Sequence, residues 1–259
     1  MKLPILEHLP LDLIEAALLA APGNELNAKF FSPCSSAALA ANTFGRFLDR
    51  PELLRAMPGV DGVIWDQVTV QLERTIRFGW RGGKHPCLDV RIDTFSHLIG
   101  IESKRFEPYR TPKPAKFSDP FAKEDVWHKG MRGYEEAYKR MIKSALAFGR
   151  VDACQLTKHA LALWNEARRM GERGQIRQPV LVYLCAEPTR WLPDGTAISA
   201  KDRDSHGASL ADFASTVAGD HVEFVSLTYS QLLDAWDVEA NSDLSFHTQA
   251  IRAEFGVDT

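Results

Sequence analysis

The sequence predicts an α/β fold with a mixed central sheet flanked by helices. Its central part reads as a helix, three strands, a helix and a buried strand, which is a mixture of the two kinds of element. The buried strand is Val180–Cys185 (VLVYLC), an apolar run typical of strands that are covered on both faces. The helix before it, Asp152–Met170, has the strongest helical pattern in the chain and ends at Gly171.

Three helices are predicted in the first 60 residues. An amphipathic helix spans residues 3–20 and is ended by a Pro-Gly-Asn turn. A second helix is capped by Ser35 or Ser36 and stops near Pro51. A third, short helical piece spans Glu52–Met57.

The strands begin with Val63–Phe78, where valine and leucine alternate with polar residues. Two shorter runs follow, Leu88–Thr94 and Leu98–Arg105, on either side of a polar turn near Phe95 and Ser96. Their spacing predicts an antiparallel hairpin.

The chain between this hairpin and the long helix is predicted to be irregular over Pro108–Gly130 and helical over Tyr134–Phe148. After the buried strand, we expect a helix at Ala208–Val217, a strand at Glu223–Thr228 and a helix at Tyr229–Trp236. An α/β pattern therefore continues to the end of the chain.

Composition predicts a soluble globular protein. Of the 259 residues, 45% are hydrophobic and 25% are charged, and we expect one domain over 1–259 with N-terminal helices at 1–60 and a basic insertion at 105–150. The four cysteines are far apart, so neither a zinc site nor a disulfide framework is supported. The apolar run Leu13–Ala21 is interrupted by Glu15, which argues against a signal peptide or membrane span. We expect a cytoplasmic protein with no membrane partner.

Charge is unevenly distributed along the chain. Between Lys104 and Arg150 there are 12 basic and 6 acidic residues, whereas the rest of the chain has 19 basic and 28 acidic ones. A basic segment on an acidic protein favours contact with a polyanion, although a solvated face is the alternative. The candidate phosphate contacts are Lys113, Lys116, Lys123, Lys139, Arg140 and Lys143. Eight aromatic residues of the segment would either stack on bases or form a small core: Phe106, Tyr109, Phe117, Phe121, Trp127, Tyr134, Tyr138 and Phe148.

The predicted hairpin brings two carboxylates together. With its turn centred near Phe95 and Ser96, Asp89 lies opposite Glu102, and alternation puts Glu102 and Lys104 on one face. Adjacent carboxylates are costly unless a cation lies between them, and a divalent metal ion is the usual solution. Asp93, opposite Leu98 in the same register, is the competing carboxylate.

An Asp on one strand followed by Glu-x-Lys on the next resembles the core motif of the PD-(D/E)xK nuclease superfamily, which has a restriction-endonuclease-like fold. The αβββαβ order of that fold agrees with the predicted elements, and Ile99–Tyr109 also resembles an uncharacterised group of restriction endonucleases. Leu88 stands where the motif has Pro, which weakens the recognition more than the chemistry.

The resemblance implies that Asp89 and Glu102 bind Mg²⁺, or Mn²⁺ in its place, with help from the carbonyl of Ser103. It further implies that Lys104 supports the attacking water and that Gln155, on the long helix, reaches the active site. Whether Lys104 orients the water, deprotonates it or stabilises the phosphate stays open.

Four nearby residues have open or structural interpretations. Glu73 is either a further ligand or an exposed strand residue, and Glu107 is expected on the other face from Glu102. Lys158 lies about one turn beyond Gln155, and His159 is interpreted as a half-buried structural histidine rather than a base.

The predicted function is metal-dependent hydrolysis of phosphodiester bonds in DNA, by a restriction-type or defence endonuclease. Two carboxylates and a metal ion suit this reaction, because the metal lowers the pKa of bound water and neutralises the developing charge. One alternative is a catalytically silent nucleic-acid-binding or assembly protein on the same fold, and another is an α/β enzyme acting on a small anionic metabolite. Cleavage of both DNA strands would favour a homodimer.

Overall fold

The computed structural model describes residues 3–22, 26, 29–192, 194–238 and 241–257. The helices are α1 (Leu11–Ala20), α2 (Ser36–Gly45), α3 (Arg132–Lys143), α4 (Ala153–Gly171), α5 (Ala200–Val217), α6 (Tyr229–Val238) and α7 (Ser242–Phe255). The strands are β1 (Thr69–Thr75), β2 (Cys87–Asp93), β3 (His97–Lys104), β4 (Gln178–Cys185) and β5 (Glu223–Thr228). Short 3₁₀ turns lie at Pro51–Leu53, Glu107–Tyr109, Asp119–Ala122, Glu124–Val126 and Lys129–Met131.

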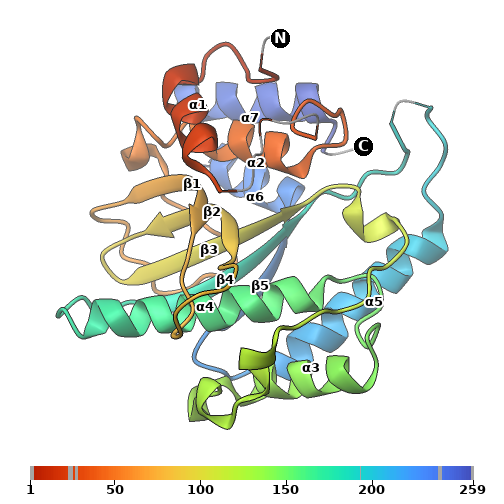
Figure 1. The fold of residues 1–259 in the computed structure, drawn as a ribbon. Helices are drawn as coiled ribbons and strands as arrows, with labels where there is room; N and C mark the ends of the chain where they lie inside the picture. Colours follow the sequence, from red (N-terminus) through yellow and green to blue (C-terminus); the bar gives the residue numbers. More distant parts are fainter. Residues whose placement is uncertain (1–2, 23–25, 27–28, 193, 239–240, 258–259) are drawn as a thin grey trace.

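Within the described residues, five strands form one mixed sheet in the order β1-β2-β3-β4-β5. The first three strands pair antiparallel, and β3, β4 and β5 pair parallel. Figure 1 shows helices on both faces of this sheet: α1, α2, α6 and α7 cover one face, and α3, α4 and α5 cover the other. The predicted fold class is therefore confirmed, with β4 as an interior strand.

Strand β3 is buried on both faces and separates the two hydrophobic layers. Ile99 and Ile101 pack in the layer under α2, whereas Leu98 packs in the layer that contains α4. Because side chains alternate along a strand, the even-numbered residues of β3 face α4. This alternation directs Glu102 and Lys104 toward that helix.

The hairpin register is the predicted one. Asp93 pairs with Leu98 and Val90 pairs with Ile101, so the two strands close around the turn at Phe95 and Ser96. The ladder stops at Val90 and Ile101, and the strands diverge beyond this pair.

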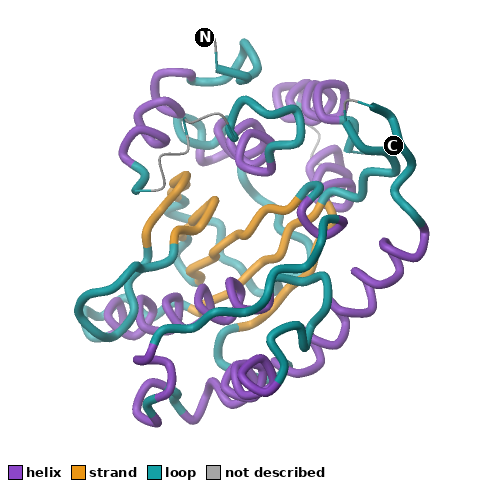
Figure 2. Tube along the Cα trace, turned by 45° about the vertical axis from the view of Figure 1, so that its right-hand side comes forward, coloured by secondary structure: helices purple, strands orange, loops and turns teal. Residues whose placement is uncertain are grey.

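The connection from β3 to α3 crosses the N-terminal half of α4, and its path can be followed in the ribbon and tube views (Figures 1 and 2). Two hydrogen bonds fix it there, because the carbonyl of Lys116 accepts from Lys158 Nζ at 2.6 Å and from Cys154 Sγ at 3.3 Å. The predicted irregular stretch, Pro108–Gly130, thus consists of short 3₁₀ turns joined by irregular chain.

Several element boundaries differ from prediction. Helix α1 begins at Leu11, because Pro10 precedes it and cannot donate inside a helix. Helix α3 ends at Lys143, where Ser144 is extended, and only a 3₁₀ turn forms near Glu52. Helix α5 begins earlier than predicted, because Ser199 caps it by accepting the amide of Asp202.

Helix α7 was missing from the prediction although its signals are present in the sequence. Asn241 caps its start by accepting the amides of Asp243 and Leu244, and Gly256 ends it in the left-handed conformation. Leu244 and Ile251 are buried against the layer of α1 and α2. Among the described residues, no helix is both long and apolar enough to cross a membrane.

Candidate active site

Three of the predicted site residues meet where β3 ends and α4 begins. Lys104 Nζ donates to Glu102 Oε1 and, at 3.0 Å, to Gln155 Oε1. Gln155 lies in the first turn of α4, and the side chain of Asp152 caps that turn by accepting the Gln155 amide at 3.0 Å. The cap therefore fixes the helix end that presents Gln155 to the motif lysine.

Asp89 reaches the same strand end through a backbone contact. Its Oδ2 accepts the amide of Ser103 at 2.6 Å, just beyond the last ladder pair of the hairpin. The carboxylate thus satisfies a strand donor that the diverging β2 no longer serves.

Regular alternation of side chains along β2 does not hold next to Asp89. Leu88 packs in the α4 layer, whereas Val90 packs in the opposite layer, although residues two apart on a regular strand share a face. On the neighbouring strand, Glu73 stands across from Asp89 with a φ of 48°, a left-handed conformation that is rare inside strands. This local distortion breaks the alternation.

Burial and mutual charge perturb the ionisation of the site. Glu102 is 1% exposed, and burial raises its pKa to about 7 despite the adjacent Lys104. Burial and the charge of Glu102 also raise the pKa of Asp89 well above its usual value. For Lys104, burial favours the neutral form, but the charges of Glu102 and Asp89 outweigh it and raise the pKa. Two carboxylates therefore share one ammonium group.

The site contains two buried polar atoms that lack a hydrogen-bond partner. Glu102 Oε2 and His159 Nδ1 are both fully enclosed, and they lie 3.3 Å apart. Burial lowers the pKa of His159 to about 3, with further lowering from Lys104 and Lys158, so the imidazole is neutral at pH 7. His159 is thus fully buried rather than half-buried as predicted.

The donor set suits a hard divalent cation. Asp89 and Glu102 offer carboxylate oxygens, the ligands that Mg²⁺ prefers. Glu102 Oε2 is a buried oxygen without a donor, which a cation would satisfy. Among the described residues, no three His, Cys, Asp or Glu side chains are grouped as metal ligands, so a further ligand would be a carbonyl, such as that of Ser103, or water.

The competing carboxylate, Asp93, is already bound by guanidinium groups. Arg91 donates to both of its oxygens, at 2.7 and 3.0 Å, and Arg177 also pairs with it. Asp93 is 7% exposed and lies at the turn end of the hairpin, away from Lys104. It has few lone pairs left for a metal ion.

The two other nearby carboxylates are also engaged. Glu107 lies in the 3₁₀ turn after β3, where it accepts from Ser36 Oγ at 2.6 Å and from the Arg105 amide at 2.8 Å. Glu73 is half-buried, accepts a weak bond from Cys87 Sγ at 3.6 Å, and contributes to the raised pKa of Glu102. Both carboxylates act on the site through their charge.

A cleft of about 200 Å³ opens beside Lys104 and Gln155. It is lined by two basic residues from the connection between β3 and α3: Lys113, one of the candidate phosphate contacts, and Arg110, which was not among them. Arg150 also lines the cleft, but it is tied to Asp202 and to the carbonyls of the connection. Arg110 and Lys113 therefore line the same cleft as the motif lysine.

Part of the predicted basic surface is committed to protein contacts. Arg140 donates to Asp212 and Thr216 on α5, and Lys139 pairs with Glu135. Their role as phosphate contacts, like that of the other lysines, stays a prediction.

The aromatic residues of the same segment form a small core, which was one of the two interpretations given for them. Phe121 and Tyr134 are 1% and 0% exposed, and Phe117 packs edge-on against Phe121 and Tyr138. All eight are buried or partly buried in packed clusters.

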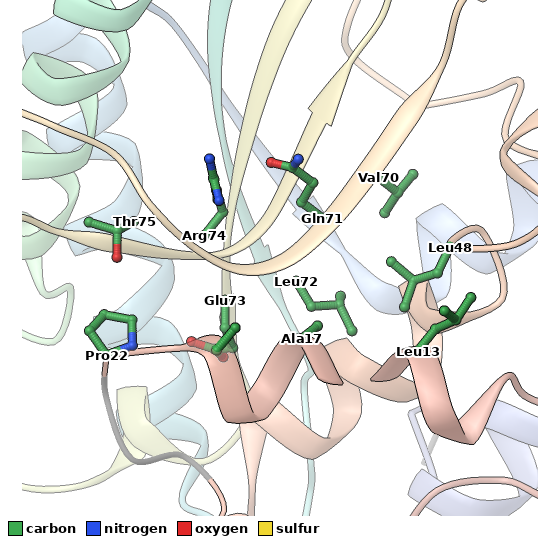
Figure 3. A pocket seen from close by; sticks show the side chains of 11 residues that line it. Leu13, Ala17, Pro22, Leu48, Val70, Gln71, Leu72, Glu73, Arg74 and Thr75 are labelled. Atoms are coloured by element: carbon green, nitrogen blue, oxygen red, sulfur yellow. The ribbon is translucent and has the colours of Figure 1, made fainter. Parts of the chain in front are cut away.

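A second hollow, of about 350 Å³, lies between α1 and the edge strand β1 (Figure 3). Its walls are mainly aliphatic, with Leu13 and Ala17 facing Leu72. Figure 3 shows Glu73 on the same side of the strand as Leu72, which agrees with the left-handed turn at Glu73. This hollow does not include Lys104 or Gln155.

The contact between His159 and Glu102 was not predicted. The signal for it is the spacing of His159 four residues after Gln155, which puts both on one face of a helix. Once Gln155 is directed at the motif strand, His159 must face that strand too.

The family model described as Restriction Endonuclease associating with ARP matches residues 21–251. No curated protein and no solved structure matches the chain. The matched region contains the hairpin, α4 and the whole sheet.

Proposed function

The chain belongs to the family described as Restriction Endonuclease associating with ARP, and on that premise we propose that it is a metal-dependent DNA endonuclease of the PD-(D/E)xK type. The observation that carries the proposal is the contact set of Glu102, Lys104 and Gln155, with Asp89 held at the same strand end. Buried carboxylates with raised pKa values, next to an open cleft, are a usual property of functional sites.

In this proposal Asp89, Glu102 and the carbonyl of Ser103 hold the metal ion, Mg²⁺ or Mn²⁺. When bound there, such an ion supplies charge neutralisation and acidifies water. Lys104 lies between Glu102 and Gln155, so its ammonium is held at the edge of the cleft. Held there, it orients the attacking water or stabilises the phosphate, and Gln155 restricts the side chain to that position.

The cleft rim fits a DNA backbone. Arg110 and Lys113 lie on the side of the cleft that the β3–α3 connection forms, within the basic part of the chain. Phosphate contacts of this kind supply affinity that weakens as salt increases. Replacing both residues by Gln should reduce the slope of log K against log salt by roughly 0.9 for each lost contact. An unchanged slope would contradict the assignment of these two cations to phosphate binding.

Cleavage of plasmid and linear DNA tests the activity. The purified protein is incubated with Mg²⁺, Mn²⁺ or EDTA, together with Glu102→Gln, Asp89→Asn and Lys104→Met. The matched control is Glu172→Gln, an exposed glutamate just after α4 whose side chain is 65% exposed. We expect cleavage by the wild type and the control only with metal, and large losses in the three site variants.

Each other outcome has a defined meaning. Cleavage that survives EDTA, or that Glu102→Gln leaves unchanged, contradicts the proposed mechanism. Salt-dependent DNA binding without cleavage in any metal would favour a catalytically silent DNA-binding protein. A homodimer, which cutting both strands would favour, stays a prediction that sedimentation of the protein with and without DNA would test.

A further inference from the structure

His159 and Glu102 form a buried polar contact that the proposed roles leave unexplained. His159 Nδ1 lies 3.3 Å from Glu102 Oε2, and the side chains of both residues are 2% exposed. Neither atom has a hydrogen-bond partner. Leaving buried polar atoms unsatisfied is energetically costly, so such a pair calls for a physical reason.

Two features make the pair complementary. Nδ1 of the imidazole can carry a proton, and at 3.3 Å from Glu102 Oε2 that N–H would be directed at the carboxylate. The other oxygen of Glu102, Oε1, already accepts from Lys104. A bond from His159 would therefore give each oxygen one donor while leaving lone pairs for a cation.

Rotation of the Glu102 carboxylate would bring its Oε2 into hydrogen-bond geometry with His159 Nδ1. The last torsion of a glutamate side chain is broad, so the carboxylate can turn at little energetic cost. Hydrogen bonds within active sites are often long in the free protein and tighten only when the site is loaded. At 3.3 Å, the two atoms are already near the distance that such a bond requires.

We propose that His159 is a positioning residue, whose Nδ1–H donates to Glu102 Oε2 and fixes the plane of that carboxylate for metal binding. The inference rests on the proposed function, because it concerns how the metal ligand is oriented. Gln155 and His159 lie one turn apart on α4, and each then positions one side chain of the motif. Gln155 positions Lys104, and His159 positions Glu102. One helix thereby sets both the charge and the ligand geometry of the strand end.

Calorimetric titration with Mn²⁺ alone, without DNA, tests the inference. His159→Leu removes the donor, His159→Asn places an amide N–H near the position of Nδ1, and His159→Gln carries its amide too far along the side chain. The matched control is Thr157→Val, which removes another buried polar atom without a partner from the same helix. Thermal unfolding in EDTA checks that each variant is folded.

We expect the Leu and Gln variants to bind Mn²⁺ about 10- to 100-fold more weakly than the wild type, which is the usual effect of removing an outer-shell partner. The Asn variant should recover most of the affinity, and Thr157→Val should match the wild type. DNA binding in EDTA should be the same for all folded variants.

Three results would overturn the inference. Wild-type Mn²⁺ affinity in folded His159→Leu would show that the histidine does not position the ligand. Equal weakening in the Asn and Leu variants would mean that its role is steric filling of the core. Absence of Mn²⁺ binding by the wild type itself would reject the proposed metal site. If the wild type binds Mn²⁺ and the His159 variants bind it equally well, only the role of His159 is rejected.

Discussion

Binding of Mn²⁺ to this protein should weaken strongly below pH 7. At the proposed metal site, protons and the metal ion would compete for the carboxylate oxygens of Asp89 and Glu102. Burial raises the pKa of Glu102 to about 7, so protonation of this carboxyl begins near neutral pH. Burial and the charge of Glu102 also raise the pKa of Asp89, which shifts its competition in the same direction. An exposed carboxylate pair would already be ionised at pH 6 and would show no such dependence.

The size of the effect follows from the titration of Glu102. With a pKa of about 7, roughly 90% of the carboxyl is ionised at pH 8 and roughly 10% at pH 6. Glu102 alone therefore weakens the apparent Mn²⁺ affinity by about tenfold between these pH values, which corresponds to about 1.4 kcal/mol. Asp89 increases this factor.

The stability of the metal-free protein should change in the opposite sense. Glu102 titrates at about 7 when folded and near 4.5 when unfolded, so the folded state binds more protons between these values. Stability falls with pH wherever the folded state binds more protons. The contribution of Glu102 to the free energy of unfolding in EDTA should thus increase as pH is lowered from about 7 toward 4.5.

Calorimetry at pH 6, 7 and 8 and constant ionic strength measures the affinity. Repeating the titration at pH 6 in two buffers of different ionisation enthalpy gives the number of protons that metal binding releases. We expect about one proton or more at pH 6, with fewer at pH 8. Equal affinity at pH 6 and pH 8, with no proton release, would refute a buried carboxylate as the metal ligand.

Three further predictions concern single residues. Gln155→Ala should lower kcat for DNA cleavage about 10-fold or more while leaving DNA binding in EDTA unchanged, because the variant frees Lys104; an equal loss of binding would assign Gln155 to substrate contact instead. Asp93→Asn should destabilise the fold by about 3–5 kcal/mol, measured by urea unfolding, because Arg91 would remain buried without a full counter-charge; a change below 1 kcal/mol would contradict this role. Gly100→Ala should cost roughly 1–3 kcal/mol by the same measurement, because the added Cβ would lie 2.9 Å from the methyl groups of Leu88 and Leu163, and an unchanged midpoint would show that the layer relaxes freely.

The hairpin shows how far local pattern determines geometry. The polar turn and the two apolar runs were enough to predict the register, including the pairing of Asp93 with Leu98. The face of Asp89 could not be obtained in the same way, because Glu73 adopts a left-handed backbone that pattern does not reveal. Strict alternation assumes a regular strand on both sides of the pair.

The helical part of the site was predictable for a different reason. Gln155 was assigned through the family resemblance and the position of the long helix, and the structure brings it to Lys104. The spacing from Gln155 indicates that His159 faces β3, but its contact with Glu102 also depends on the distance between α4 and β3, which the spacing does not give. Packing distances of this kind are set by the residues between the elements, such as Gly100, which lets Leu163 approach the strand.

The charge count alone does not show where the basic residues lie in the fold. Basic residues are in excess between Lys104 and Arg150, but Arg140 forms an ion pair with Asp212 on α5. Arg110 and Lys113, by contrast, line the cleft beside the motif. A charge count averages over both faces of a segment, and only the fold separates them.

The β2–β3 hairpin is held by ion pairs at its turn end and is less constrained at its other end. At the turn, Asp93 is fastened to Arg91 and Arg177, and Arg91 is tied to Glu166 on α4. At the other end the ladder has stopped, and the Asp89 side chain is what bridges to β3. Metal ions that differ by a few tenths of an ångström in ligand distance, such as Mg²⁺ and Ca²⁺, would then move only the free end. If the proposed metal site is correct, tolerance of ion size and stability of the fold would depend on opposite ends of the same two strands.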